Sequence, residues 1–160
     1  MRGVNKEQIS DEQYMMRALE LAKKAAECGE VHVGALIVRD GEILAEAYNL
    51  RETNRMATSH AELLAIEEAC RRLGGWRLNG CTLYVTLEPC PMCAGALVNS
   101  RIDRVVFGVK DSVAGCCGSV LNLNSYPFNH AFSLTVGVCE EECRSVLREF
   151  FQKKRGADNA

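Results

Sequence analysis

The first half of the chain alternates between helical and strand-like hydrophobic patterns. Residues 10–13 form a Ser-Asp-Glu-Gln capping box, and apolar side chains then recur at helical spacing. The segment 33–49 contains two β-rich runs on either side of Asp40-Gly41, which is a strong signal for a hairpin. A polar loop over 49–58 leads to a second helical segment, 59–75, which ends in two glycines. This half is therefore predicted to fold as helix, hairpin and helix.

The second half carries three further strands with nearly continuous apolar runs. We expect strands over 81–87, 103–109 and 133–138, a short helix from Cys90, and a last helix over about 140–154. Continuous apolar strands are typical of a sheet that helices cover on both faces. The order of elements predicts an α/β fold, a three-layer α/β/α sandwich around a central five-stranded mixed sheet.

Length and composition narrow the class of protein. A chain of 160 residues is the size of one domain, which we expect to be ordered over about 8–155 with a disordered tail at 156–160. The net charge is only −2, so a polyanionic partner has to be met by a local basic patch. Residues 1–12 are polar, and no apolar run approaches the length of a membrane span. We therefore expect a cytoplasmic protein, with no membrane partner, whose nine cysteines are reduced, buried or metal-bound.

The stretch "LEPCPMCAG" at 87–95 presents two cysteines at a spacing used for metal ligands. Cys90 and Cys93 follow a predicted strand at the start of a predicted helix. Such a pair can be a redox dithiol, half of a structural zinc site or part of a catalytic one. The third partner decides, and His60 begins another helix with Glu62 two residues later. One imidazole and two thiolates suit a tetrahedral catalytic zinc, with Glu62 beside the metal as the proton carrier.

A structural interpretation of the histidine stretch also has to be considered. Ser59-His60-Ala61-Glu62 has the sequence of a capping box, with Ser59 at the N-cap and Glu62 three positions later. Taken alone, capping is the simpler interpretation. The Pro-Cys-x-x-Cys unit about thirty residues later reverses that preference, because two helix starts would then bring one imidazole and two thiolates to one place.

The histidine and cysteine motifs together resemble a known enzyme signature. His60-Ala61-Glu62 and Pro89-Cys90-Pro91-Met92-Cys93 match the H-x-E…P-C-x-x-C pattern of zinc-dependent nucleobase deaminases. Outside this pattern, the chain resembles the tRNA-specific adenosine deaminases, which make inosine at the wobble position, from about Tyr14 to Arg155. The segments that carry this closer resemblance are 82–111, 118–123 and 150–155.

The resemblance implies a cytidine deaminase-like fold, one zinc ion per chain, and a homodimer that binds the anticodon stem-loop of tRNA. By position, Asn49 matches a family residue that hydrogen-bonds the target nucleotide, and Asp111 falls on a loop beside the flipped-out base. Three stretches depart from the family pattern, and one of them, 115–119, carries two cysteines where small residues are common. His32 stands where the family usually has proline, and Met56-Ala57 stand where it has Asp-Pro, so a stiff turn is replaced by a flexible one.

Three rival functions stay open on the sequence. They are a guanine deaminase of the same fold, a non-catalytic zinc-stabilised binding protein, and a thiol redox protein that uses Cys90 and Cys93.

Several other side chains have simple structural interpretations. We expect His32 to be structural, His130 to be solvated or capping, and Cys116 and Cys117 to be unpaired thiols. The basic end of the last helix, 148–155, is either a solvated terminus or a surface that faces RNA phosphates.

Overall fold

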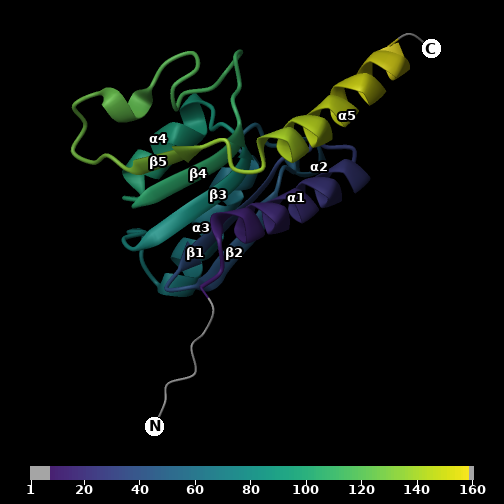
Figure 1. Cartoon of the computed structure of the whole chain (residues 1–160). Coiled ribbons are helices and arrows are strands. Elements are labelled where there is room, and N and C mark those ends of the chain that lie inside the picture. Colours follow the sequence, from purple (N-terminus) through teal and green to yellow (C-terminus); the bar gives the residue numbers. More distant parts are fainter. Residues whose placement is uncertain (1–7, 159–160) are drawn as a thin grey trace.

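In the computed structural model, which describes residues 8–158, five strands form one sheet and helices cover both of its faces (Figure 1). The elements are, in chain order, α1 (Asp11–Glu27), β1 (Gly34–Arg39), β2 (Glu42–Tyr48), α2 (Arg51–Asn54), α3 (Ala61–Leu73), β3 (Cys81–Leu87), α4 (Pro91–Asn99), β4 (Arg104–Val109), the 3-10 turn η1 (Leu123–Ser125), β5 (Ser133–Val136) and α5 (Glu140–Asp158).

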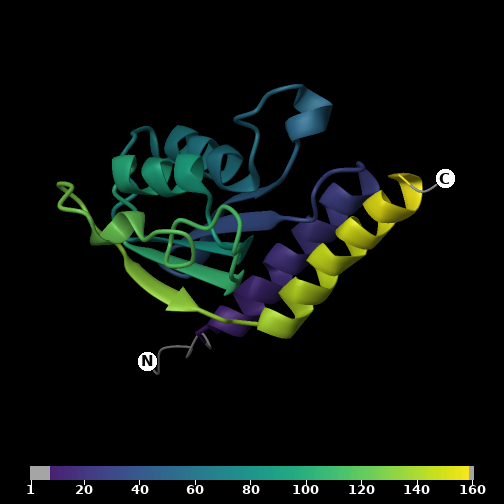
Figure 2. The ribbon, with the colours of Figure 1, turned by 90° about the horizontal axis from the view of Figure 1, so that it is seen from above.

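The sheet has the strand order β2-β1-β3-β4-β5 and is mixed. β1 runs antiparallel to β2 and β3, whereas β4 runs parallel to both β3 and β5. Helices α3 and α4 lie on one face, and α1 and α5 lie side by side on the other (Figure 2). The predicted three-layer α/β/α sandwich with a five-stranded mixed sheet is confirmed.

Local sequence signals determine where α1 and the hairpin are placed. The hydroxyl of Ser10 accepts a hydrogen bond from the backbone N–H of Gln13, whose side chain accepts one from the backbone N–H of Ser10. This is the predicted capping box. Asp40 and Gly41 have φ angles of 51° and 76°, as a two-residue type I′ turn requires. The turn lets β2 fold back on β1, which pairs with β3 at the centre of the sheet.

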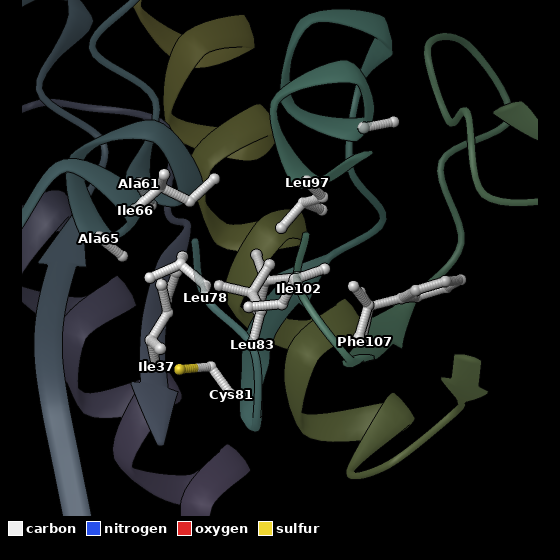
Figure 3. Packing of buried hydrophobic residues seen from close by; sticks show 14 of the residues in the cluster. Ile37, Ala61, Ala65, Ile66, Leu78, Cys81, Leu83, Leu97, Ile102 and Phe107 are labelled. Atoms are coloured by element: carbon white, nitrogen blue, oxygen red, sulfur yellow. The ribbon is translucent and has the colours of Figure 1, made fainter. Parts of the chain in front are cut away.

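Buried side chains fill the layer between the sheet and helices α3 and α4 (Figure 3). The cluster includes Ile37, Leu83 and Phe107 from the strands, and Ala65 and Leu97 from the helices. All five are almost completely removed from solvent. This packing fixes the start of α3 and the start of α4 against the end of β3.

A second buried cluster fills the opposite layer, between the sheet and helices α1 and α5. It includes Met15, Leu36, Tyr84 and Val106. Leu83 and Tyr84 are neighbours on β3 and belong to different layers, as the alternation of side chains along a strand requires. Burial on both faces explains why the central strands are continuous apolar runs.

Two segments differ from the sequence prediction. The 49–58 loop contains the short helix α2, and α5 continues to Asp158, so residues 156–158 are helical where a disordered tail is predicted. A glycine weakens a helix by about 1 kcal/mol without ending it, and Gly156 therefore does not terminate α5. Residues 159–160 and 1–7 lie outside the described part. None of the helices within residues 8–158, α5 included, combines the length and the apolar character needed to cross a bilayer.

Candidate active site

Two helix starts on the same face of the sheet bring the predicted metal ligands together. His60 is the N-cap residue of α3, and Cys90 is the N-cap residue of α4, directly after β3. Pro91 occupies the first position of α4, where its missing N–H costs nothing. Nδ1 of His60 lies 3.6 Å from Sγ of Cys90 and 3.5 Å from Sγ of Cys93. Within residues 8–158, these three side chains form the one group of three metal-ligating residues whose donor atoms lie close together.

The spacing of the donor atoms fits a tetrahedral metal ion. Zinc bonds of about 2.0–2.1 Å to nitrogen and 2.3 Å to sulfur, at a tetrahedral angle, place the two ligand atoms about 3.6 Å apart. The distances from Nδ1 of His60 to both sulfurs agree with that value. One nitrogen and two sulfurs leave the fourth position open, which is the arrangement of catalytic rather than structural zinc sites. The donor set is therefore compatible with a metal site.

The ionisation of the cysteines supports the same assignment. Hydrogen bonds from Cys93 and from His60 lower the pKa of Cys90 to about 4, although burial opposes this change. The bond to Cys90 in turn raises the pKa of His60. The pKa of Cys93 is raised by its contact with the sulfur of Cys90, by burial and by the charge of Glu62. Since metal ligands must be deprotonated, a bound cation would displace the proton that Cys93 holds.

Glu62 is buried next to the three candidate metal ligands without being one of them. Its side chain is 4% exposed, and Oε2 accepts a hydrogen bond from Cys93 at 3.2 Å. Burial raises the pKa of this carboxyl group. A raised carboxyl pKa suits a group that has to accept and return a proton near neutral pH.

The capping interpretation of this stretch is wrong. The N-cap residue of α3 is His60 rather than Ser59, and no side chain there makes a capping hydrogen bond. The Ser59 hydroxyl instead accepts a hydrogen bond from the amide of Asn54. Glu62 consequently forms no capping box with Ser59, and its carboxylate contacts Cys93, one of the candidate metal ligands.

A cavity of about 160 Å³ opens directly onto these residues. His60, Cys90 and Glu62 contribute to its lining, together with residues from segments that are far apart in the sequence. The lining residues are Val31, Val33, Asn49, Arg51, His60, Ala61, Glu62, Leu87, Glu88, Cys90, Asp111 and Ala114. The cavity contains Asn49 and Asp111, the two residues that the resemblance places near the substrate.

The side chains of Asn49 and Asp111 are held by backbone N–H groups two or three residues further along the chain. The side-chain oxygen of Asn49 accepts a hydrogen bond from the backbone N–H of Arg51, and Asn49 is 7% exposed. One carboxylate oxygen of Asp111 accepts from the N–H groups of Val113 and Ala114. Each side chain is therefore fixed in orientation at the cavity before any ligand binds.

Sequence reasoning missed Arg51 and Glu88 as cavity residues. Arg51 carried no motif signal, because it belongs to a loop whose path the sequence does not define. Glu88 did carry a signal, since it is a carboxylate between a buried strand and Pro89. It is 2% exposed, which is unusual for an acidic residue and implies dedicated hydrogen-bond partners.

The two remaining histidines lie outside the cavity. Nδ1 of His32 is 2.8 Å from the carbonyl oxygen of Val146 in α5, and its ring packs edge-on against Phe150. The structural role predicted for His32 is confirmed. Nε2 of His130 is 2.6 Å from the carbonyl oxygen of Ile102, so it holds the loop before β5 rather than facing the substrate cavity.

The structure also shows the state of Cys116 and Cys117 and the conformation of the turn that contains Met56-Ala57. Cys116 and Cys117 are buried and unpaired, as predicted. In the turn that contains Met56-Ala57, the N–H of Ser59 bonds to the carbonyl oxygen of Met56. Backbone hydrogen bonds therefore close this turn where the family usually has a proline.

Comparisons with known proteins agree with this geometry. The chain matches the family model described as MafB19-like deaminase over residues 9–155. A tRNA-specific adenosine deaminase of Bacillus subtilis (strain 168) is 56% identical over 146 residues, which is 91% of each chain. A solved structure from work on "A-to-I Editing by tRNA:A34 Deaminases" has a TM-score of 0.82 at 40% identity, covering 84% of this chain and 98% of that one.

A guanine deaminase structure from Bacillus subtilis is a weaker match. It is 39% identical with a TM-score of 0.61, and the match covers 64% of this chain and 66% of that one. The resemblance noted from the sequence is thus confirmed. The chain belongs to the MafB19-like deaminase family, and its relatives place it among the tRNA-specific adenosine deaminases.

Proposed function

We propose that this protein hydrolyses adenosine to inosine at the wobble position of a tRNA anticodon, with zinc held by His60, Cys90 and Cys93. The observation that carries the proposal is the buried carboxylate of Glu62, in the lining of a cavity and 3.2 Å from one of three convergent metal ligands. A carboxylate beside such a site, but not bound to the metal, is what hydrolytic deamination needs.

Glu62 is the group that moves protons in the proposed reaction. Zinc at this site would activate a water molecule for attack at neutral pH. Glu62 takes one proton from the water and delivers it to N1 of the purine ring as C6 is attacked. It then carries the second water proton to the amino group, so that ammonia leaves and a carbonyl remains at C6. The carboxylate ends the cycle as it began, and its raised pKa favours both transfers.

The cavity limits the substrate to a single unpaired base. A volume of about 160 Å³ admits one base but not a base pair, so the nucleotide has to leave its stack. Asn49 and Asp111 are far apart in the sequence, and both line the cavity. The side-chain amide nitrogen of Asn49 makes no hydrogen bond within residues 8–158. It is available to bind the nucleotide, as the resemblance implies for this position.

A basic groove next to the cavity is suited to the RNA backbone. This groove, of about 620 Å³, lies between α5 and the end of β4 and is lined by Val109, Lys110, Arg144, Leu147, Arg148, Phe151, Lys154, Arg155 and Asp158. Arg144 is paired with Glu140 and Glu141, but Lys110, Arg148 and Lys154 form no ion pair within residues 8–158. Lys110 lines the groove and the next residue, Asp111, lines the cavity. A strand whose base enters the cavity can therefore run its phosphates along the groove.

We propose a homodimer, as the resemblance implies, with the tRNA in contact with both subunits. The loop between β4 and β5 exposes several large apolar side chains: Val113, Val120, Leu121, Tyr126 and Phe128. An adjoining apolar groove of about 420 Å³ is lined in part by Leu63, Met92 and Phe128. A second copy of the chain would cover these apolar side chains. A tRNA substrate and nine unpaired cysteines both fit the cytoplasm.

The proposal is tested by incubating the zinc-loaded protein with a set of tRNA anticodon stem-loops and with free nucleobases and nucleosides. We expect inosine and ammonia only from stem-loops with adenosine at the wobble position. Turnover of free guanine at a comparable rate would replace the proposed substrate while leaving the metal site unchanged. Zinc content without ammonia release from any of these would indicate a binding protein.

A further inference from the structure

Two buried carboxylates, Glu88 in the cavity lining and Glu30 bonded to helix α2, take no part in metal binding or proton transfer. Glu30 is 1% exposed and Glu88 is 2% exposed, although acidic side chains are rarely buried to this degree. Neither belongs to the group formed by the metal ligands and Glu62. Each is surrounded by hydrogen-bond donors, and in both cases the donors come from one loop that borders the cavity.

Glu88 organises the loop on one side of the cavity. One of its oxygens accepts from the N–H of Asp111 at 3.2 Å and from the hydroxyl of Ser119. The other accepts from the N–H groups of Cys117 and Ser119, at 3.0 and 3.1 Å. Three backbone groups of residues 111–119 thus converge on a single carboxylate.

The close approach of this loop explains the glycine at position 115. A Cβ atom on Gly115 would lie 2.3 Å from Oε2 of Glu88 and 2.5 Å from the carbonyl oxygen of Asp111. Such distances are far shorter than any real contact, so residue 115 has to lack a side chain for the loop to wrap the carboxylate. The backbone and Glu88 are therefore matched to each other, and Asp111 and Ala114 are held at the cavity as a result.

Glu30 does the same on the other side. Its carboxylate accepts from the N–H groups of Glu52 and Thr53, at 3.2 and 2.8 Å, and from the hydroxyl of Thr53 at 3.2 Å. These N–H groups belong to the first turn of α2, whose N-cap residue, Leu50, offers no side-chain cap. Glu30 supplies from a distance the acceptor that the helix lacks.

Helix α2 is held by this carboxylate and by hydrogen bonds to the segment that follows it, such as the one from Asn54 to Ser59. None of its four residues is buried, and Figure 2 shows it standing beyond the layer of α3 and α4. It begins two residues after Asn49, whose side-chain oxygen accepts a hydrogen bond from the N–H of Arg51 at the start of α2. Both Asn49 and Arg51 line the cavity. The position of these two side chains therefore depends on the anchoring of α2 by Glu30.

We propose that Glu30 and Glu88 are positioning residues that hold two segments of the cavity lining, and that they set the affinity for the nucleotide without moving a proton. The inference rests on the proposed function only for the choice of substrate. Each carboxylate acts through a loop: Glu30 through α2 on Asn49 and Arg51, and Glu88 through 111–119 on Asp111.

The test uses the zinc-loaded Glu30→Gln and Glu88→Gln variants. An amide can replace only one of the two acceptor oxygens, and its NH₂ group faces donors. We expect KM for the anticodon stem-loop to rise about tenfold or more, the size of a lost hydrogen bond to a charged group, with kcat changed much less and zinc content unchanged. Amide hydrogen exchange should quicken at Glu52 and Thr53 in the first variant, and at Asp111, Cys117 and Ser119 in the second.

Asp103→Asn is the matched control. Its carboxylate also accepts from a loop N–H, that of Gly80 at 2.7 Å, but beside the start of β3, away from the cavity. This variant should leave KM unchanged. Faster exchange in the two loops with an unchanged KM would overturn the proposal, and so would unchanged exchange.

Milder variants keep the proposal testable if the buried substitutions prevent folding. Ser119→Ala and Thr53→Val each remove one donor and leave the carboxylate in place, whereas Ser119→Thr and Thr53→Ser keep the hydroxyl. Ser119→Ala and Thr53→Val should raise KM, whereas Ser119→Thr and Thr53→Ser should have a KM close to that of the wild type. Equal KM values in the two groups of variants would contradict the proposal. A wild-type protein inactive on every stem-loop would instead refute the proposed function, while the exchange measurements would still report on the two loops.

Discussion

The sulfur of Cys93 lies 3.2 Å from Oε2 of Glu62, so a candidate metal ligand donates a hydrogen bond to the candidate proton carrier. The bond requires the thiol form of Cys93, whereas metal coordination requires the thiolate. Metal binding would remove this donor and leave Oε2 of Glu62 able to accept a proton from water at the open coordination position. The contact therefore links occupation of the metal site to the availability of the carboxylate.

Replacing Glu62 with glutamine should abolish turnover without harming the fold. The amide cannot carry a proton, and loss of a general acid–base group typically costs about 10²–10⁴-fold in rate. Because no capping bond is lost and burial of the charged carboxylate is unfavourable, the melting temperature should stay the same or rise. Rates of inosine formation, zinc content and thermal melting of the same preparation check this. A variant with wild-type turnover would remove Glu62 from the mechanism.

Substitution of any of the three proposed ligands should remove the metal. We expect about one zinc ion per chain in the wild-type protein and a large loss in Cys90→Ser and His60→Ala, because three protein ligands are the minimum of a catalytic zinc site. Elemental analysis after dialysis measures this directly. Cys116→Ala is a suitable control, since Cys116 is a buried thiol near the cavity that is not part of the three-residue group. Undiminished zinc in the ligand variants would show that the assignment is wrong.

The layers of the fold could be predicted from the sequence, because each helix and strand is marked by a local pattern. The meeting of the two motifs could also be predicted, because each motif stands at the start of a helix. The capping box at Ser10, the turn at Asp40-Gly41 and the runs of buried strand residues all act over short distances. The identity of the N-cap residue of α3 was not predictable in this way. Ser59 has the preferred residue type, but its hydroxyl is already bonded to Asn54, and this bond forms only once α2 is in place.

The partners of buried carboxylates were also beyond the sequence. Glu30 bonds to residues more than twenty positions later, and Glu88 bonds across a loop whose path has no periodicity. Such contacts depend on the folded backbone. An acidic residue next to an apolar segment of the sequence indicates only that, if it is buried, some hydrogen-bond partner must exist. The walls of the cavity are for this reason the part of the site that sequence patterns described least.

The stability of the protein should depend on Asp11 in a pH-dependent manner. Hydrogen bonds from Arg104, aided by one from Tyr84 and by the charge of Arg104, lower the pKa of Asp11, with both Arg104 contacts shorter than 3 Å. A carboxyl group whose pKa is lower in the folded state stabilises that state above its unfolded pKa of about 3.9 and loses this effect as the pH falls through the folded value. Asp11→Asn should therefore cost about 1–2 kcal/mol at pH 7, reduced for partial exposure, and progressively less as the pH falls below about 3.9 towards the folded pKa.

Denaturant unfolding of the wild type and Asp11→Asn at several pH values measures this difference. Tyr84→Phe is the control, because it removes one hydrogen bond to Asp11 and leaves the ion pair with Arg104 in place. Tyr84→Phe should therefore keep most of the acid dependence of the wild type and lose only the part that this hydrogen bond contributes. A difference between wild type and Asp11→Asn that stays constant from pH 7 to pH 3 would contradict this account of Asp11.

Binding of an anticodon stem-loop should weaken with added salt, and the groove beside α5 should account for part of that dependence. Each phosphate that a lysine or arginine neutralises releases counterions, which adds about 0.7–0.9 to the slope of log K against log salt. The double variant Arg148→Ala/Lys154→Ala removes two groove charges that lack an ion pair within residues 8–158, so its slope should be smaller by about one to two and its affinity lower at low salt. Arg39→Ala removes a charge at the opposite end of the sheet and should leave the slope unchanged. Arg39 is the last residue of β1, and in the sheet it lies opposite Cys81, the first residue of β3. Equal slopes for the wild type and the double variant would exclude the groove as the path of the RNA backbone.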